Sequence, residues 1–250
     1  MKIVSWNILQ GGGSRSPDIV ATLKQLEADV LAVQEFRHGN SKPVLLQGFD
    51  ELGYESRLLP EPESLATGAP SGKTLNTVGL VSHYPIEGEV LLPSDADRVD
   101  AALAIRANVS IIDADVEDIN FVVVHLPHKQ KQLPYFKMLL SLPAELRAGH
   151  SILIGDFNCG IPFEDSETKS FHATQQFQSL LSQGWIDAWR CRNPKAREYT
   201  WVSSRKGNGF RYDHALVSPA LNERINSIEY LHEPRERGIS DHSVLVLDID

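Results

Sequence analysis

The chain has 250 residues, of which 42% are hydrophobic and 23% charged, with a formal net charge of −9. This composition is typical of a globular protein with enough apolar material for a sizeable core. The two cysteines are too few for a disulfide scaffold or a thiolate metal site, and an acidic chain is not expected to grip long nucleic acids tightly and non-specifically.

The sequence contains no pattern typical of export or membrane insertion. The stretch Met1–Asn7 turns polar too early for the apolar part of a secretory signal, and no apolar run reaches the ~18 residues of a membrane span. Cys159 and Cys191 fit a reducing compartment. We therefore expect a cytoplasmic protein that does not bind membranes, and a monomer.

The first half of the chain alternates strands and helices and then becomes a run of strands. Apolar stretches predict strands at Lys2–Trp6 and Val30–Gln34, and helical periodicity predicts a helix at Pro17–Glu27 with Ser16 as N-cap. A helix at Val44–Leu52 and a loop at Pro60–Asn76 are also expected. Further strands are predicted at Tyr54–Leu58, Thr77–Ser82, Glu89–Leu92, Ala102–Val109 and Phe121–His125.

The second half continues the same mixture. Lys131–Arg147 is a helix candidate weakened by Pro134 and Pro143, and a second helix is predicted at Phe171–Ser182. Strands are predicted at Ser151–Gly155, Tyr199–Val202, Phe210–Val217 and Val244–Ile249. Many strands with few helices predict two packed sheets with helices outside them, in a single α/β (α+β) domain over residues 1–250.

Several predicted strands end in carboxylate, amide or imidazole side chains. One Asn or Glu after a strand is more often a turn former, and one His is more often a structural residue. The repetition is harder to explain in this way, because rigid strand ends commonly carry catalytic groups. The residues concerned are Asn7, Gln34 and Glu35, His125, Asp156 and Asn158, Asp213 and His214, and Asp241 and His242.

This set of side chains suits phosphodiester hydrolysis. That reaction needs charge neutralisation on the phosphoryl oxygens, an activated water and help for the leaving oxygen. Carboxylates such as Glu35 and Asp241 are ligands that Mg²⁺ or Mn²⁺ prefers. A His paired with an Asp can face a phosphate as imidazolium or transfer a proton.

Taken in order, these stretches resemble the endonuclease/exonuclease/phosphatase family. The resemblance rests on Ser5-Trp6-Asn7, Leu31-Ala32-Val33-Gln34-Glu35, Gly155-Asp156-Phe157-Asn158 and Ser240-Asp241-His242. In the second half, the stretches 184–190, 199–201 and 210–218 follow the pattern of the exonuclease III branch. The resemblance implies a four-layered α/β sandwich of two packed mixed sheets flanked by helices.

The resemblance also implies roles for individual residues. Glu35 would be the principal ligand of Mg²⁺ or Mn²⁺, with Asn7 and Asp241 close to the metal or its waters. Asp156 would orient or deprotonate the attacking water, and Asn158 would hold the scissile phosphate. The remaining catalytic residues would be His242 facing the phosphate, Asp213 as its hydrogen-bonded partner, and His125 near the phosphate or leaving group.

The chain departs from the exonuclease III pattern at some positions. His125-Leu126-Pro127 has a histidine where that branch has a tyrosine, which resembles the deoxyribonuclease and sphingomyelinase branches. The stretch 72–76 lacks the acidic partner that deoxyribonuclease I would supply to this histidine. The long inserts with which abasic-site enzymes grip duplex DNA are also not found.

Basic residues and a glycine run leave alternatives open. Arg211, together with Arg205 and Lys206, is either a substrate phosphate contact or part of a solvated surface, as are Lys129, Lys131 and the cluster from Arg190 to Arg197. Gly11-Gly12-Gly13 could cradle a phosphate, although a plain connection to the next helix is favoured and a dinucleotide cofactor is not supported.

The leading functional hypothesis is a divalent-metal-dependent nuclease that acts on DNA, with RNA left open. An alternative is a phosphodiesterase or phosphatase for a small or lipid-linked phosphate ester, which the acidic charge and His125 favour. A catalytically inactive nucleic-acid-binding regulator is disfavoured, because every expected metal ligand and the His–Asp pair are present.

Overall fold

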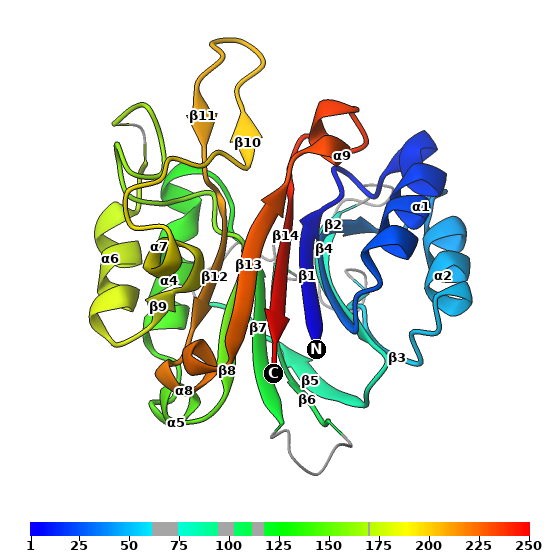
Figure 1. The fold of residues 1–250 in the computed structure, drawn as a ribbon, viewed down its shortest axis with the longest axis horizontal. Coiled ribbons are helices and arrows are strands. Elements are labelled where there is room, and N and C mark those ends of the chain that lie inside the picture. Colours follow the sequence, from blue (N-terminus) through cyan, green and yellow to red (C-terminus); the bar gives the residue numbers. More distant parts are fainter. Residues whose placement is uncertain (62–74, 95–102, 112–117, 170) are drawn as a thin grey trace.

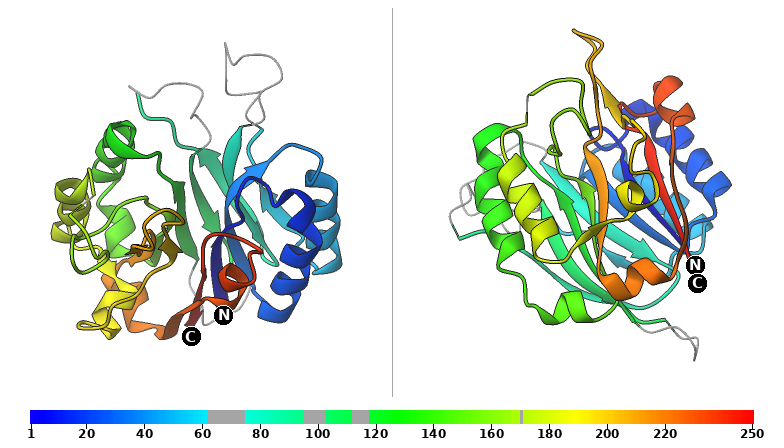
Figure 2. Two further views of the ribbon diagram at one scale, coloured as in Figure 1. Left: turned by 90° about the horizontal axis from the view of Figure 1, so that it is seen from above. Right: turned by 60° about the vertical axis from the view of Figure 1, so that its left-hand side comes forward.

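The computed structural model describes residues 1–61, 75–94, 103–111, 118–169 and 171–250. Within these ranges the chain forms two six-stranded sheets packed face to face, with helices on their outer sides (Figure 1). Most of the loop expected at Pro60–Asn76, namely residues 62–74, lies outside the described residues. The four-layered arrangement of helix, sheet, sheet and helix predicted from the sequence is confirmed (Figure 2).

The first sheet combines both ends of the chain. Its central strands are β14, which runs antiparallel to β1, and β2, which runs parallel to β1. The order across the sheet is β13 (Ile225–Leu231), β14 (Val244–Ile249), β1 (Lys2–Asn7), β2 (Val30–Arg37), β4 (Asn76–Ser82) and β3 (Ser56–Leu58).

The second sheet is built from the middle of the chain. Its core is the parallel pair of β7 and β8, with β12 antiparallel to β8. The order is β5 (Ile86–Val90), β6 (Ala104–Val109), β7 (Ile119–His125), β8 (Ser151–Asp156), β12 (Asp213–Val217) and β9 (Ile186–Asp187). A separate two-stranded hairpin, β10 (Trp201–Val202) and β11 (Gly209–Phe210), projects from one end of the molecule (Figures 1 and 2).

Helices cover the outer face of each sheet. Residues such as Leu23 and Phe49 of α1 (Ser16–Leu26) and α2 (Lys42–Glu51) pack on the first sheet, and residues such as Phe136 and Phe177 of α4 (Leu133–Leu140) and α6 (Thr174–Ser182) pack on the second. The largest apolar cluster fills the space between the sheets. The shorter helices are α5 (Glu145–Ala148), α7 (Ala188–Arg192), α8 (Pro219–Glu223) and α9 (Glu233–Glu236).

The element boundaries differ from the sequence predictions in several places. The helix expected at Lys131–Arg147 is divided into a short 3₁₀ turn, α4 and α5, because Pro134 and Pro143 fit only at or before the first turn of a helix. The first helix begins at Ser16, one residue earlier than expected, so that Arg15 and not Ser16 precedes it. β9, β13 and the helices α7, α8 and α9 were not predicted.

Among the described residues, no helix is both long and apolar enough to cross a membrane.

Candidate active site

The register of three neighbouring strands in the second sheet places three of the predicted residues side by side. His125 at the end of β7 pairs with Asp156 at the end of β8, and Asp156 pairs with Asp213 at the start of β12. Residues in register on adjacent strands point to the same face of a sheet. All three side chains therefore lie at the same end of this sheet, and all three are buried.

The first sheet contributes Asn7 and Glu35 to the same place. Asn7 ends β1, and Glu35 lies two residues before the end of the neighbouring parallel strand β2. The pairing of β2 with β4 is irregular between Val33 and Phe36, and Glu35 has a left-handed backbone with φ 58°. Asn7 Nδ2 donates to Asp156 Oδ2 at 3.1 Å and lies 3.4 Å from Glu35 Oε1. The two sheets are thus joined by one amide group between two carboxylates.

His242 lies on the other side of Asp156. Its Nδ1 is 2.8 Å from Asp213 Oδ2, and its Nε2 is 3.7 Å from Asp156 Oδ2. His125 Nε2 lies 3.7 Å from Asp156 Oδ2 and 3.8 Å from Glu35 Oε1. Asp156 is therefore flanked by two imidazoles, and only His242 has a carboxylate partner of its own at hydrogen-bond distance.

Asn158 is held next to Asp156 by a tight turn. Its backbone N–H donates to Asp156 Oδ1 at 2.8 Å, and its side-chain Nδ2 donates to Leu126 O at 2.8 Å. The backbone of Asn158 is left-handed, with φ 47°. Asn tolerates this conformation better than most residues, which agrees with its place in this tight turn.

At both Asp156 and His242, burial and the neighbouring opposite charges act on the pKa in opposite directions. Burial raises the pKa of Asp156 to about 7, against the effect of His242. Burial would lower the pKa of His242, but Asp213 and Asp156 outweigh it and raise that pKa to about 10. Burial lowers the pKa of His125 to about 4, against the effect of Glu35. These surroundings favour the imidazolium form at His242 and the neutral form at His125.

The chain matches the endonuclease/exonuclease/phosphatase family over residues 4–242. It belongs to this family. The family comprises metal-dependent nucleases and phosphatases, so this member is a metal-dependent hydrolase of phosphate ester bonds.

Solved structures share the fold of this family member over its whole length. A 3′ phosphatase from Neisseria bound to a product DNA hairpin is 24% identical, with a TM-score of 0.81 over 100% of this chain and 99% of that chain. An AP endonuclease from Archaeoglobus fulgidus is 23% identical, with a TM-score of 0.77 and the same coverage. A 3′–5′ exonuclease from Neisseria meningitidis is 24% identical, with a TM-score of 0.80 over all of both chains.

The donor set fits a divalent cation of the kind that this family uses. Asp241 Oδ2 accepts a hydrogen bond from Trp201 Nε1 at 3.0 Å, whereas its buried Oδ1 has no hydrogen-bond partner among the described residues. A buried carboxylate oxygen without a partner is costly unless a cation or water satisfies it. A further group of potential ligands, with atoms within 4.8 Å of one another, consists of Asp156, Asp213 and His242.

Asn7 presents its amide nitrogen, not its oxygen, to the carboxylates. Asn7 Oδ1 accepts a hydrogen bond from the Leu9 N–H at 3.0 Å, and Nδ2 faces Glu35 and Asp156. In this arrangement Asn7 acts as a donor between the two carboxylates. The expected place of Asn7 close to the metal or its waters stays a prediction.

Arg211 does not lie at the site, contrary to the role in substrate binding expected from its sequence position. Its side chain is 1% exposed, and its guanidinium donates to Asp165 and Asp187 at distances of 2.6 to 3.0 Å. These two carboxylates occupy the donors that a phosphate would need, so Arg211 has a structural role. Arg190 and Arg192 are likewise engaged with backbone carbonyls of the protein.

Some contributors to the site could not be predicted individually. Trp201 binds Asp241, and Thr200 Oγ1 accepts from the backbone N–H groups of Tyr212 and Asp213. The sequence indicates this strand only through its Tyr-Thr-Trp pattern. The backbone N–H of Gln10, which donates to Glu35 Oε2 at 2.7 Å, gives no signal in the side-chain pattern.

Proposed function

We propose that the protein is a nuclease that uses Mg²⁺ or Mn²⁺ to hydrolyse phosphodiester bonds in DNA, in the manner of the exonuclease III branch. The observation that supports this most strongly is the position of Asp156. Its Oδ2 accepts from Asn7 and lies near both His242 and His125, while its Oδ1 accepts from the backbone of Asn158. Residues 1–250 would form one catalytic domain of a cytoplasmic, monomeric enzyme.

Asp156 and His242 would carry the proton and charge movements. Asp156 would orient and deprotonate the attacking water, because it is a buried carboxylate held in place by hydrogen bonds from two residues. His242, kept cationic by Asp213, would face the negative phosphoryl oxygens. His125 would contact the phosphate or the leaving group, and Asn158 would hold the scissile phosphate.

Glu35 would be the principal metal ligand, with Asp241 and Asn7 close to the ion or its waters. A bound divalent cation would neutralise charge that develops on the phosphate oxygens. Glu35 is suited to this role because Oε2 is already held by the backbone of Gln10, which leaves Oε1 toward the centre of the site. Asn7 would orient Asp156 and Glu35 relative to each other.

The surface around the strand ends supports a nucleic acid substrate. The hairpin β10–β11 projects at this end of the molecule (Figure 1). Its loop carries Arg205 and Lys206, which are both exposed. Trp201 joins the base of the hairpin to Asp241. Arginine and lysine at such a tip can contact successive phosphates of a backbone. The Neisseria relative of similar fold is described as bound to a DNA hairpin.

A small or lipid-linked phosphate ester is the second candidate substrate. It is favoured by His125, by the net charge of −9 and by the structural roles of Arg190, Arg192 and Arg211, which remove these three arginines from substrate binding. An enzyme for a small or lipid-linked phosphate ester would not need Arg205 and Lys206 to bind its substrate. It would also be insensitive to duplex DNA as a competitor.

One experiment separates the two candidates. The purified protein is incubated with Mg²⁺ or Mn²⁺ and end-labelled single-stranded, duplex, nicked and abasic DNA and RNA, alongside bis(p-nitrophenyl) phosphate and an EDTA control. The proposal expects metal-dependent cleavage of DNA, and duplex DNA should inhibit hydrolysis of the small ester. Hydrolysis of the small ester alone, with no inhibition by DNA, would contradict the nuclease proposal and support the second candidate.

A further inference from the structure

The segment between β1 and α1 forms a left-handed turn over consecutive residues. The φ angles are 51° at Leu9, 56° at Gln10, 72° at Gly11, 75° at Gly12 and 51° at Gly13. Glycine adopts this conformation readily, whereas Leu and Gln do so only at an energetic cost. Strain of this kind persists where surrounding contacts impose it, and it is concentrated at functional sites.

The turn holds Glu35 at both its carboxylate and its backbone. The Gln10 N–H donates to Glu35 Oε2 at 2.7 Å, and the Gly11 N–H donates to Glu35 O at 2.7 Å. The Gly12 N–H donates to Leu9 O within the turn. The amides of Gly11 and Gly12 are therefore already used by the protein, and the turn is neither a phosphate cradle at these amides nor a plain connection.

Arg15 ties the same turn to the segment that carries Asp241. Its guanidinium donates to Leu9 O at 2.7 Å and also to Ile239 O. Ser240 Oγ donates to Asn7 O at 2.5 Å, which adds a second tie between these parts of the chain. Glu35 and Asp241 lie far apart in sequence and do not share a strand, so their separation depends on such ties.

We propose that the Leu9–Gly13 turn and Arg15 form a positioning element that fixes Glu35 relative to Asp241 before the cation binds, and so determines the affinity for the metal. The turn occupies Oε2 and leaves Oε1 toward Asn7 and His125. Fixing a ligand in its bound geometry reduces the ordering that binding must supply. The inference rests on the proposed function only in taking Glu35 and Asp241 as the metal-binding carboxylates.

Two glycines of the turn provide a matched pair of variants. A Cβ on Gly11 would lie 2.8 Å from Arg37 Cβ, so Gly11→Ala must displace the turn from β2. A Cβ on Gly13 would meet no atom within 4 Å, although its φ is also positive. Both changes introduce a left-handed alanine, but only Gly11→Ala moves the amides that hold Glu35. Arg15→Gln adds no bulk and removes the tie between Leu9 and Ile239.

The test is Mn²⁺ binding measured by isothermal titration calorimetry, with thermal unfolding as a check on folding. Gly11→Ala and Arg15→Gln should each raise the dissociation constant for Mn²⁺ about tenfold or more, the size of effect known for residues that orient metal ligands. Gly13→Ala should leave it within about twofold of the unmodified protein. Cleavage by the first two variants should recover at saturating metal, because the catalytic residues are unchanged.

Unchanged Mn²⁺ affinity in folded Gly11→Ala and Arg15→Gln would overturn the positioning role while leaving the proposed nuclease function intact. If Gly11→Ala does not fold, Arg15→Gln decides alone. A protein whose Mn²⁺ affinity follows the expected pattern, but which cleaves no nucleic acid, would support the positioning element and contradict the nuclease. Absence of Mn²⁺ binding by the unmodified protein would overturn both.

Discussion

Asn7 and Asp156 are joined by a hydrogen bond that crosses from one sheet of the sandwich to the other. Asn7 ends β1 and Asp156 ends β8, and the distance from Nδ2 to Oδ2 is 3.1 Å. Asn7 also lies 3.4 Å from Glu35 Oε1, so a single amide fixes the separation of the two central carboxylates. The alignment of the site therefore depends on how the two sheets pack.

Asn7→Ala should lower kcat about tenfold to a hundredfold, because Asp156 and Glu35 lose the donor that aligns them. The free energy of unfolding should fall by about 1 to 3 kcal/mol, since buried acceptors lose a partner. Steady-state kinetics and urea denaturation measure the two effects. Asn108→Ala, which removes an amide from β6 outside the site, is the control and should leave kcat unchanged. An unaltered kcat in Asn7→Ala would contradict the alignment role.

Asp213→Asn tests the partnership with His242. The carboxylate lies 2.8 Å from Nδ1 and holds the imidazole in orientation and charge. We expect kcat to fall about a hundredfold or more, with the metal concentration for half-maximal rate unchanged. Glu198→Gln, which breaks the His232–Glu198 pair, is a control with a comparable His–carboxylate contact of 3.1 Å. Equal losses in the two variants would point to a general effect on folding and not on catalysis.

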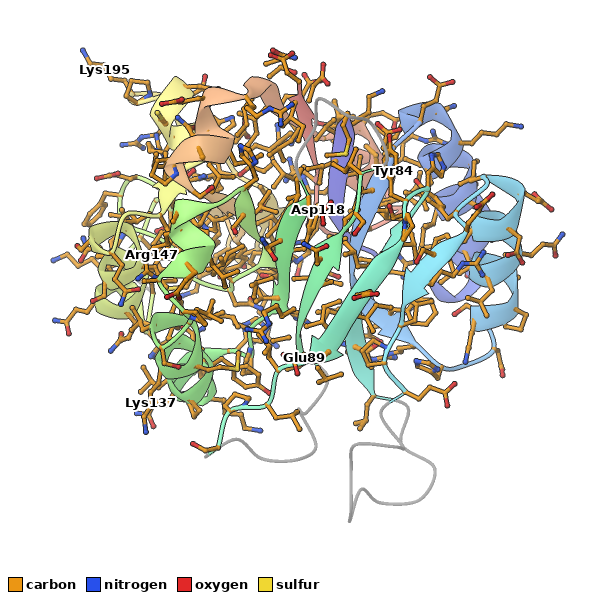
Figure 3. The ribbon with its side chains drawn as sticks, turned by 90° about the horizontal axis from the view of Figure 1, so that it is seen from below. Tyr84, Glu89, Asp118, Lys137, Arg147 and Lys195 are labelled. Carbon is orange, nitrogen blue, oxygen red and sulfur yellow. The ribbon has the colours of Figure 1, made fainter. Side chains whose placement is uncertain are left out.

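Removing the charges at the tip of the hairpin tests the substrate class. The double change Arg205→Ala and Lys206→Ala should weaken DNA binding and reduce the slope of log K against log salt by about 1.8, the value for two phosphate contacts. Hydrolysis of bis(p-nitrophenyl) phosphate should not change. Lys195→Ala is the matched control, because Lys195 is also exposed and projects outward at the edge of the molecule (Figure 3). If the double variant bound DNA as tightly as the unmodified protein, Arg205 and Lys206 would not be DNA contacts.

The buried ion pairs of Arg211 with Asp165 and Asp187 make the free energy of unfolding depend on pH in the acid range. Burial would raise the pKa of Asp187, but the guanidinium of Arg211 outweighs it and holds that pKa well below its usual range. A group with a depressed folded pKa stabilises the fold above its ordinary pKa of about 4, and this contribution is lost as pH falls further. Asp187→Asn should therefore lower the free energy of unfolding by about 3 kcal/mol at neutral pH, because Arg211 loses a buried partner.

The difference in the free energy of unfolding between Asp187→Asn and the unmodified protein should become smaller as the pH falls from about 4 towards 2. Urea denaturation at several pH values in this range and at pH 7 measures it. A difference that stays constant from neutral to acid pH would show that the carboxylate charge of Asp187 does not stabilise the fold.

Local patterns in the sequence predicted two packed sheets and the polar residues at the strand ends, whereas the four-layered sandwich was implied by the resemblance to the family. Apolar runs mark β1, β2, β7 and β8, and a polar side chain at or near the end of each lies at the site. Arg211 was expected to contact a substrate phosphate or to lie on a solvated surface, because Asp165 and Asp187 are distant in sequence and only the fold shows that both are buried beside it. The hydrogen bonds from the backbone N–H groups of Gln10 and Gly11 to Glu35 could not be predicted either, because side-chain patterns do not indicate backbone hydrogen bonds.

Single-turnover cleavage of labelled duplex DNA tests most directly whether the metal-loaded site hydrolyses a phosphodiester with the help of Asp156. The unmodified protein and Asp156→Asn are compared at saturating Mn²⁺, with thermal unfolding confirming that both are folded. We predict cleavage by the unmodified protein that EDTA abolishes, and a rate at least about a thousandfold lower in Asp156→Asn. A variant that cleaves at nearly the original rate would contradict the role of Asp156 and, with it, the proposed mechanism.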